Sequence, residues 1–142
     1  MWPHDTAIAI HGLAREGLAD HAAVLSHQLA AAAAAFDYRL PELFGGFASG
    51  EFEAPLAYPA SCRPQAWSAA AAVVVLRATL GLEPDVPNGV CRLAPVTTFG
   101  ALEVSGLQLA GQPASVTTDA TGAVTASSLP HGVSIDSRQP RD

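Results

Sequence analysis

Three short segments of this chain combine aromatic rings with carboxylate or amide groups. They are Trp2-Pro3-His4-Asp5, Leu40-Pro41-Glu42-Leu43-Phe44, and residues 58–67, which run from a Tyr to a Trp and include Gln65. Aromatic rings stack on the flat face of a sugar ring, and carboxylates and amides form hydrogen bonds with its hydroxyl groups. This mixture of side chains predicts carbohydrate chemistry.

Each segment is expected to lie at the end of a helix. Apolar residues at helical spacing predict three helices: residues 6–17, 20–36 and 64–80. Asp5 and Asp20 stand where an N-cap would accept a backbone hydrogen bond. Gly17 and Gly81 stand where the first and third helices would end.

Beyond residues 83–89 the apolar pattern changes from a helical period to alternation. Alternation predicts antiparallel β structure, with three or four short strands in hairpins between Cys91 and Ile135. The alternating stretches are residues 102–104, 107–109, 116–118 and 124–126, with turns at 111–113 and 119–122. Residues 136–142 are polar and expected to fray. The chain is thus predicted to be mainly α and then β, divided into residues 1–89 and 90–142.

The connections between the helices predict where the three segments meet. If the first two helices form an antiparallel hairpin, the start of the first lies beside the end of the second, and the third begins near that end. Asp5, Glu42 and Gln65 would then share one rim. Helix N-termini at such a rim also offer free N–H groups to polar ligands, so the rim is a candidate ligand mouth.

Taken together, the three segments resemble a known family in order and in residues. The C-terminal part of bacterial glycogen debranching enzymes, of the amylo-α-1,6-glucosidase type, is similar to Trp2-Pro3-His4-Asp5, Leu40-Pro41-Glu42-Leu43-Phe44-x-Gly46-Phe47 and Tyr58-Pro59-x-x-Cys62-x-Pro64-Gln65-Ala66-Trp67. The tail beyond Gly81 looks like the closing β segment of the family, so the resemblance covers nearly the whole chain. It implies the last inner, outer and inner helices of a glucoamylase-like (α/α)6 barrel, of the six-hairpin glycosidase type, and then a small antiparallel β segment.

The resemblance also implies an activity, the hydrolysis of α-1,6-glucosidic branches in glycogen or limit dextrin. Inverting glycosidases use one carboxyl as general acid and a second as general base. The resemblance assigns Glu42 as the base, with Glu51 and Glu53 as rivals in the same loop. It implies a glucose site lined by Trp2, His4, Asp5, Gln65 and Trp67. Each has a plainer explanation: His4 as a turn residue, Asp5 as a helix cap, Glu42 as a solvated loop residue, Gln65 as an ordinary helix-start residue, and the Trp rings as core.

This sequence departs from the family at its start, because no Trp- and Asp-rich motif carrying the general acid precedes Trp2. We therefore expect a C-terminal fragment that is inactive alone and is completed by an upstream part of the barrel. A non-catalytic glucan-binding or barrel-completing module is the alternative, and a purely structural protein is a third class. Catalysis by Cys62 with His4 is a further alternative, although nothing visible in the sequence lowers the pKa of that thiol.

Composition limits the remaining classes of partner. The formal net charge is -6 and all seven basic residues are Arg, so neither nucleic acid nor an anionic membrane is an expected partner. The most apolar run, residues 66–76, is about half the roughly 20 residues that cross a bilayer. Without a secretory signal, Cys62 and Cys91 are expected to be reduced thiols in the cytoplasm, although a pairing between them stays open. His11, His21 and His27 have no ligand spacing with carboxylates, and neither metal nor cofactor is expected.

Overall fold

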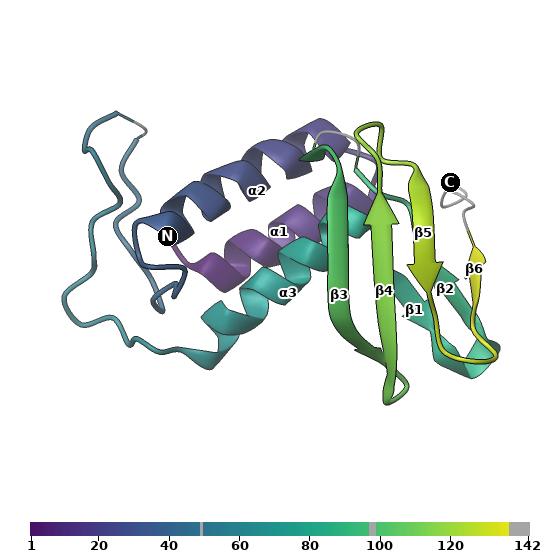
Figure 1. Ribbon diagram of the computed structural model, residues 1–142. Helices are drawn as coiled ribbons and strands as arrows, with labels where there is room; N and C mark the ends of the chain where they lie inside the picture. Colours follow the sequence, from purple (N-terminus) through teal and green to yellow (C-terminus); the bar gives the residue numbers. More distant parts are fainter. Residues whose placement is uncertain (49, 97–98, 137–142) are drawn as a thin grey trace. The chain divides into compact units, whose positions relative to one another are not determined.

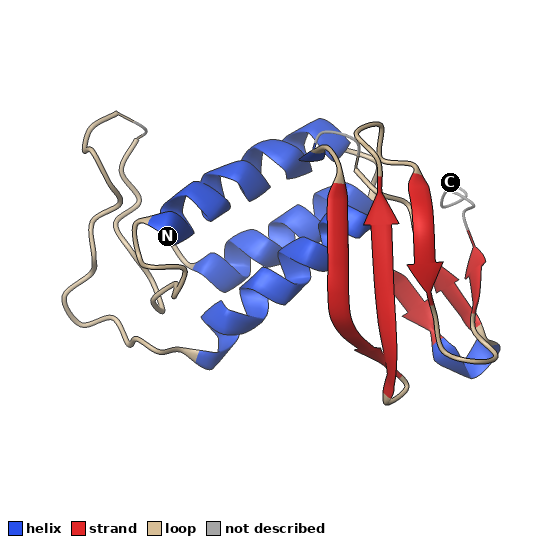
Figure 2. Cartoon of the chain, viewed as in Figure 1, coloured by secondary structure: helices blue, strands red, loops and turns tan. Residues whose placement is uncertain are grey.

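The computed structural model describes residues 1–48, 50–96 and 99–136 (Figure 1). The chain divides into two compact units, Met1–Leu76 and Arg77–Asp142. The first unit contains two complete helices and most of a third, and the second contains the strands (Figure 2). The chain is therefore mixed α and β, with helices first and strands after, as the sequence predicts.

Helix α1 spans Pro3–Arg15 and begins three residues earlier than the pattern predicts. Pro3 is its first residue, because the fixed φ of proline suits the first helical position and its missing N–H has no helical partner there. The N-cap is Trp2, which makes no side-chain capping bond, so the prediction that Asp5 is the N-cap is wrong. Asp5 lies in the first turn, where its charge still favours the helix dipole.

Helix α1 ends at a glycine motif that makes two backbone hydrogen bonds and connects α1 to α2. Gly17 has a φ of 75°, and its N–H donates to the carbonyl of Ala14 at 3.3 Å. The N–H of Leu18 donates to the carbonyl of Leu13 at 2.9 Å, which completes the pattern of a Schellman motif. The prediction that Gly17 ends the first helix is confirmed.

Helix α2 spans Ala19–Ala34 and packs against α1 as an antiparallel hairpin (Figure 1). Its N-cap is Leu18, so the prediction that Asp20 is the cap is also wrong, and Asp20 lies in the first turn. The motif at Gly17 leads directly into α2, which leaves no residue between the helices for an acidic cap. The buried residues of α2 are mostly small, which allows the neighbouring helix to approach closely. They are Ala22, Ala23, Ser26, Leu29 and Ala32.

Helix α3 spans Ala66–Leu80, within two residues of the prediction. Gly81 follows with a φ of 55°, and the N–H of Leu82 donates to the carbonyl of Arg77 at 2.9 Å. A Cβ on Gly81 would lie 2.1 Å from the carbonyl oxygen of Ala94, so only glycine fits this position. The prediction that Gly81 closes the helix is confirmed.

One antiparallel sheet in the second unit has the strand order β3-β4-β5. Its strands are Leu102–Leu109, Gln112–Thr118 and Val124–Ser128. The register shifts between Val104 and Leu107, so two predicted short strands are one strand with a bulge. Antiparallel hairpins over this segment are confirmed.

The two turns of this sheet meet the prediction differently. Asp119 forms the expected turn, because its Oδ1 accepts the N–H of Thr121 at 2.8 Å and the N–H of Ala123 at 3.1 Å. The other turn falls on Ala110 and Gly111, both with positive φ, so of the predicted turn residues 111–113 only Gly111 lies in it. Two central residues of positive φ match the twist of a hairpin, so residues 112–113 are left to begin β4.

A second sheet has the order β1-β2-β6, with strands Glu83–Asp85, Val90–Arg92 and Ser134–Asp136. A short 3-10 helix, Val86–Asn88, links β1 to β2. Strand β6 pairs with β2 in parallel, so the prediction of purely antiparallel structure is wrong for this pair. The whole β3-β4-β5 sheet lies between β2 and β6 in the chain, and a connection of that length permits parallel pairing.

The helical unit has a core cluster of Ala32, Phe36 and Phe44, with Leu40 packed against it. This cluster fixes the end of α2 against the loop that follows it. The described residues contain three α-helices, whereas an (α/α)6 barrel requires six helical hairpins. The barrel is therefore not seen in this chain and stays part of the proposal below.

None of the described helices is both long enough and apolar enough to cross a membrane.

Candidate functional site

The three sequence segments contact one another within the helical unit. The amine of Met1 donates to the carbonyl of Phe44, and the N–H of Phe44 donates back to the carbonyl of Met1 at 3.0 Å. The hydroxyl of Ser68, in the first turn of α3, donates to the carbonyl of Pro41 at 2.8 Å. The N-terminus, the loop after α2 and the start of α3 thus lie at one end of this unit (Figure 1).

An aromatic cluster joins the start of α1 to the start of α3. The ring of His4 stacks on Trp67, with centroids 4.8 Å apart and planes 17° from parallel. Trp2 meets the same imidazole edge to face, at 5.6 Å. Trp2 and Trp67 are 39% and 48% exposed, so both residues contact the cluster and remain partly accessible to solvent. Partly exposed aromatic rings of this kind are platforms on which a sugar ring can stack.

His4 has two different nitrogen environments in this cluster. Nε2 lies 3.1 Å from Oδ1 of Asp5, whose side chain is exposed. Nδ1 is buried and has no hydrogen-bond partner among the described residues. A buried polar nitrogen usually has a hydrogen-bond partner, so Nδ1 is a position at which a ligand hydroxyl could bind.

Glu42 is attached to the third segment through both its backbone and its side chain. Its N–H donates to the carbonyl of Cys62 at 2.9 Å, and its Oε2 accepts the N–H of Cys62 at 3.3 Å. The next residue, Leu43, donates its N–H to Oγ of Ser61 at 3.0 Å. The carboxylate is partly exposed and oriented through one oxygen, which suits a group that must accept a proton from water.

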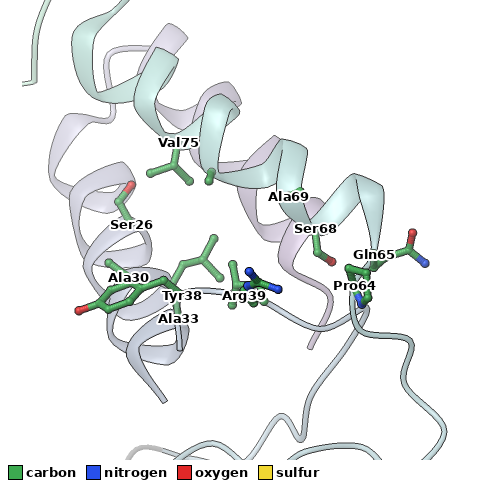
Figure 3. Close-up of a pocket in the computed structure, with 13 residues that line it drawn as sticks. Ser26, Ala30, Ala33, Tyr38, Arg39, Pro64, Gln65, Ser68, Ala69 and Val75 are labelled. Carbon is green, nitrogen blue, oxygen red and sulfur yellow. The ribbon is translucent and has the colours of Figure 1, made fainter. Parts of the chain in front are cut away.

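Gln65 lies at the start of α3 and lines a cavity of about 540 Å3 (Figure 3). Its Oε1 accepts the N–H of Ala66 at 2.8 Å, so the amide oxygen serves the helix start. In Figure 3 the amide points away from the centre of the cavity. The walls of the cavity come from α2, α3 and the loop between them and are mostly aliphatic: Leu29, Ala30, Ala33, Leu40, Ala69, Ala72 and Val75. Of the predicted site residues, Gln65 alone lines this cavity.

Two positioning residues were missed by the sequence analysis, Ser68 and Arg63. Arg63 donates from Nη2 to the carbonyl of Phe36 at 2.8 Å and to Oδ2 of Asp37 at 3.2 Å. It thereby connects the third segment to the end of α2, where Asp37 and Tyr38 have the unusual φ values of 53° and 57°. Arg63 could have been found from the sequence because it lies inside the aromatic-rich third segment. Nothing in the sequence indicates a role for Ser68 except that it follows Trp67.

The rival carboxylates lie elsewhere in the loop. Oε2 of Glu51 accepts the N–H of Ala48 at 2.6 Å and shapes an exposed turn. Glu53 is exposed and lines a second cavity, which is described below. Neither makes a hydrogen bond to the third segment, which is the contact that orients Glu42.

Cysteine and metal chemistry find little support among the described residues. Both cysteines are free, Cys62 exposed and Cys91 buried. Burial, and then the charge of Glu83, raises the pKa of the Cys91 thiol, which makes it a poor nucleophile. The described part of the chain holds no group of three or more His, Cys, Asp or Glu side chains arranged to bind a metal.

Comparison with protein-family models and with curated proteins found no match to this chain.

Proposed function

We propose that the chain is the C-terminal part of a cytoplasmic glycoside hydrolase of the glycogen-debranching type. It would bind α-glucan at the rim formed by the three segments and act on α-1,6 branches with inversion. The observation that supports this most is the pairwise contact of the segments, because it ties the loop of Glu42 to the helix that carries the exposed Trp67. The resemblance of the ordered motifs to the debranching family also supports the proposal.

In this proposal Glu42 is the general base. It accepts a proton from water as the water attacks the anomeric carbon, on the face opposite to the leaving oxygen. Trp2 and Trp67 stack on glucose, and His4, Asp5 and Gln65 bind its hydroxyls. The general acid and the remaining helices of an (α/α)6 barrel come from a preceding part of the protein.

The test is Glu42→Gln in a longer protein that contains this chain and hydrolyses a branched limit dextrin. Gln keeps the size and hydrogen-bonding shape of the side chain but cannot take a proton, so kcat should fall by about a hundredfold or more. Asp5→Asn should act mainly on KM, since it alters sugar contact and leaves the base intact. Near-normal turnover of Glu42→Gln, together with loss of activity in Glu51→Gln or Glu53→Gln, would place the base later in the loop.

A non-catalytic glucan-binding module is the second candidate. It is favoured by the aromatic cluster, because Trp2 and Trp67 can hold a sugar without any acid or base. The glycogen affinity of the 142-residue chain distinguishes the two: a module binds glycogen as tightly alone as within a longer protein, whereas a barrel fragment binds it more weakly alone. In either case Trp67→Ala should reduce glycogen binding.

A further inference from the structure

A second cavity, of about 410 Å3, lies on the helical unit between α2 and the described part of the following loop, residues 45–48 and 50–56. The side chains that matter for its chemistry are Gln28, Phe44, Phe47, Phe52 and Glu53. Its volume falls within the range of roughly 300–1,000 Å3 that small-molecule sites occupy. None of the residues assigned above to glucose binding lines it.

The loop that forms one wall is closed at its base by backbone pairing. Phe44 and Ala57 form an antiparallel bridge, and the N–H of Gly45 donates to the carbonyl of Leu56 at 2.8 Å. Loops with joined ends hold a defined shape through their own contacts, and such loops are frequently functional. The cavity wall is thus a built feature of the helical unit.

Phe47 and Phe52 form an exposed ring pair on this loop. Their centroids lie 4.8 Å apart, with the planes at 66°, and the residues are 55% and 48% exposed. A Cβ placed on Gly45 would lie 2.7 Å from Cε2 of Phe47, so the ring lies directly against the backbone of a glycine. Two exposed Phe rings gain nothing from water, and their fixed placement against this glycine offers a ready apolar platform.

Gln28 and Glu53 add polar groups to the same cavity, one from α2 and one from the loop. An amide that donates and accepts, a carboxylate that accepts, and a pair of rings together match the alternating apolar faces and hydroxyl edges of a hexose. Both side chains are exposed and so are accessible to a polar ligand, whereas a purely apolar partner would offer them no hydrogen bond. A sugar therefore fits this lining better than a hydrophobic helix does.

We propose that this cavity is an additional subsite that binds a glucose unit of an α-glucan chain, outside the rim that carries Glu42. The two places are continuous in the chain: Met1 lines the cavity and precedes Trp2 of the aromatic cluster, and Phe44 lines it two residues after Glu42. A glucan bound at the rim would extend into the cavity, which selects for long outer chains. The preference for long chains rests on the proposed function, whereas sugar binding in this cavity does not.

The experiment measures binding of maltoheptaose and of maltose to the 142-residue chain by titration calorimetry. Phe47→Ala and Phe52→Ala should each weaken maltoheptaose binding roughly tenfold, the effect of losing one aromatic contact. Tyr38→Ala is the matched control, because Tyr38 is 80% exposed, lies outside the three segments and does not line this cavity. If all three variants bind maltoheptaose equally, or if the wild-type chain binds no oligosaccharide, the subsite is refuted.

A glycine pair tests the placement of the ring without removing it. Gly45→Ala should displace Phe47 and weaken maltoheptaose binding, since the new methyl group would overlap the ring. Gly46→Ala should not, because its Cβ would meet only the amine of Met1 at an ordinary 3.7 Å. Equal losses in the two variants would show that the loop merely collapses, which contradicts a placed ring.

Trp67→Ala separates this inference from the proposed function. Loss of maltoheptaose binding in the Phe variants but not in Trp67→Ala supports the cavity and counts against the rim. Loss in Trp67→Ala alone supports the rim and refutes the cavity. Comparable losses in both, with a smaller effect of the Phe variants on maltose, support one extended glucan path over the two places.

Discussion

The hydrogen bond from Ser68 to Pro41 allows a testable prediction about what holds the loop of Glu42 in place. Ser68 is 1% exposed and its hydroxyl donates to the carbonyl of Pro41, itself buried, at 2.8 Å. Ser68→Ala removes the donor and leaves that carbonyl without its partner. An unsatisfied buried polar group costs about 1–3 kcal/mol, and the better helix propensity of Ala returns about 0.5 kcal/mol. We expect Ser68→Ala to lower the free energy of unfolding by about 1–2 kcal/mol.

Ser26→Ala is the matched control for this substitution. Ser26 is 2% exposed and donates to the carbonyl of Ala22 at 2.8 Å, one turn back within α2. A carbonyl inside a helix already accepts a backbone N–H, so this substitution leaves no polar group unsatisfied. Its free energy of unfolding should change by less than about 0.5 kcal/mol.

Urea or thermal unfolding followed by circular dichroism measures both variants. Ser68→Ala should lower Tm by roughly 3–8 °C, and Ser26→Ala should leave it near the wild-type value. Equal shifts in the two variants would refute the reasoning, because the loss would then come from buried serine in general. In an active longer protein, Ser68→Ala should also reduce kcat, since the loop of Glu42 would lose its attachment to α3.

Three further predictions concern the second unit and the cysteines. Gly81→Ala should destabilise the fold by about 2–4 kcal/mol, because its Cβ would lie 2.1 Å from the carbonyl oxygen of Ala94. Gly111→Ala should cost only about 1 kcal/mol, for its positive φ alone, and urea unfolding measures both variants. The hydroxyl and backbone of Thr121 lower the pKa of Asp119. This carboxylate therefore stabilises the fold above about pH 4 and loses that effect as pH falls through its lowered pKa. The urea midpoint of Asp119→Asn should drop less between pH 4 and pH 2 than that of the wild-type protein. A thiol reagent should label Cys62 rapidly in the native protein and Cys91 only on unfolding, and equal rates would contradict the burial of Cys91.

The helices could be predicted because their signals are local. Apolar spacing and the glycines at positions 17 and 81 depend on a few neighbouring residues, and they placed the three helices to within a few residues. The caps failed because two rules compete at a helix start. Asp5 and Asp20 are good cap residues, but Pro3 and the turn at Gly17 start each helix earlier, so both aspartates fall inside the first turn.

The two sheets differ in how far the local sequence pattern predicts their strand pairing. Alternation found the hairpin strands, because each pairs with its neighbour in sequence. It did not indicate that β6 pairs with β2, since nothing in the three residues of Ser134–Asp136 specifies a partner more than 40 residues away. Strands this short take their pairing from the surrounding chain and not from their own propensity.

The site divides in the same way between what topology dictates and what individual contacts add. A helical hairpin followed by a third helix is enough to bring the start of α1, the loop after α2 and the start of α3 to one end, so the rim was predictable. The orientation of Glu42 was not, because it depends on the backbone of Cys62 and on the hydroxyls of Ser61 and Ser68, which no motif singled out. In the proposed function, sugar binding at the rim would rely on the stacked rings, whereas catalysis would rely on that separate set of bonds. Under that proposal the two functions could be lost independently, and a chain that keeps the rings but not these bonds would still bind glucan.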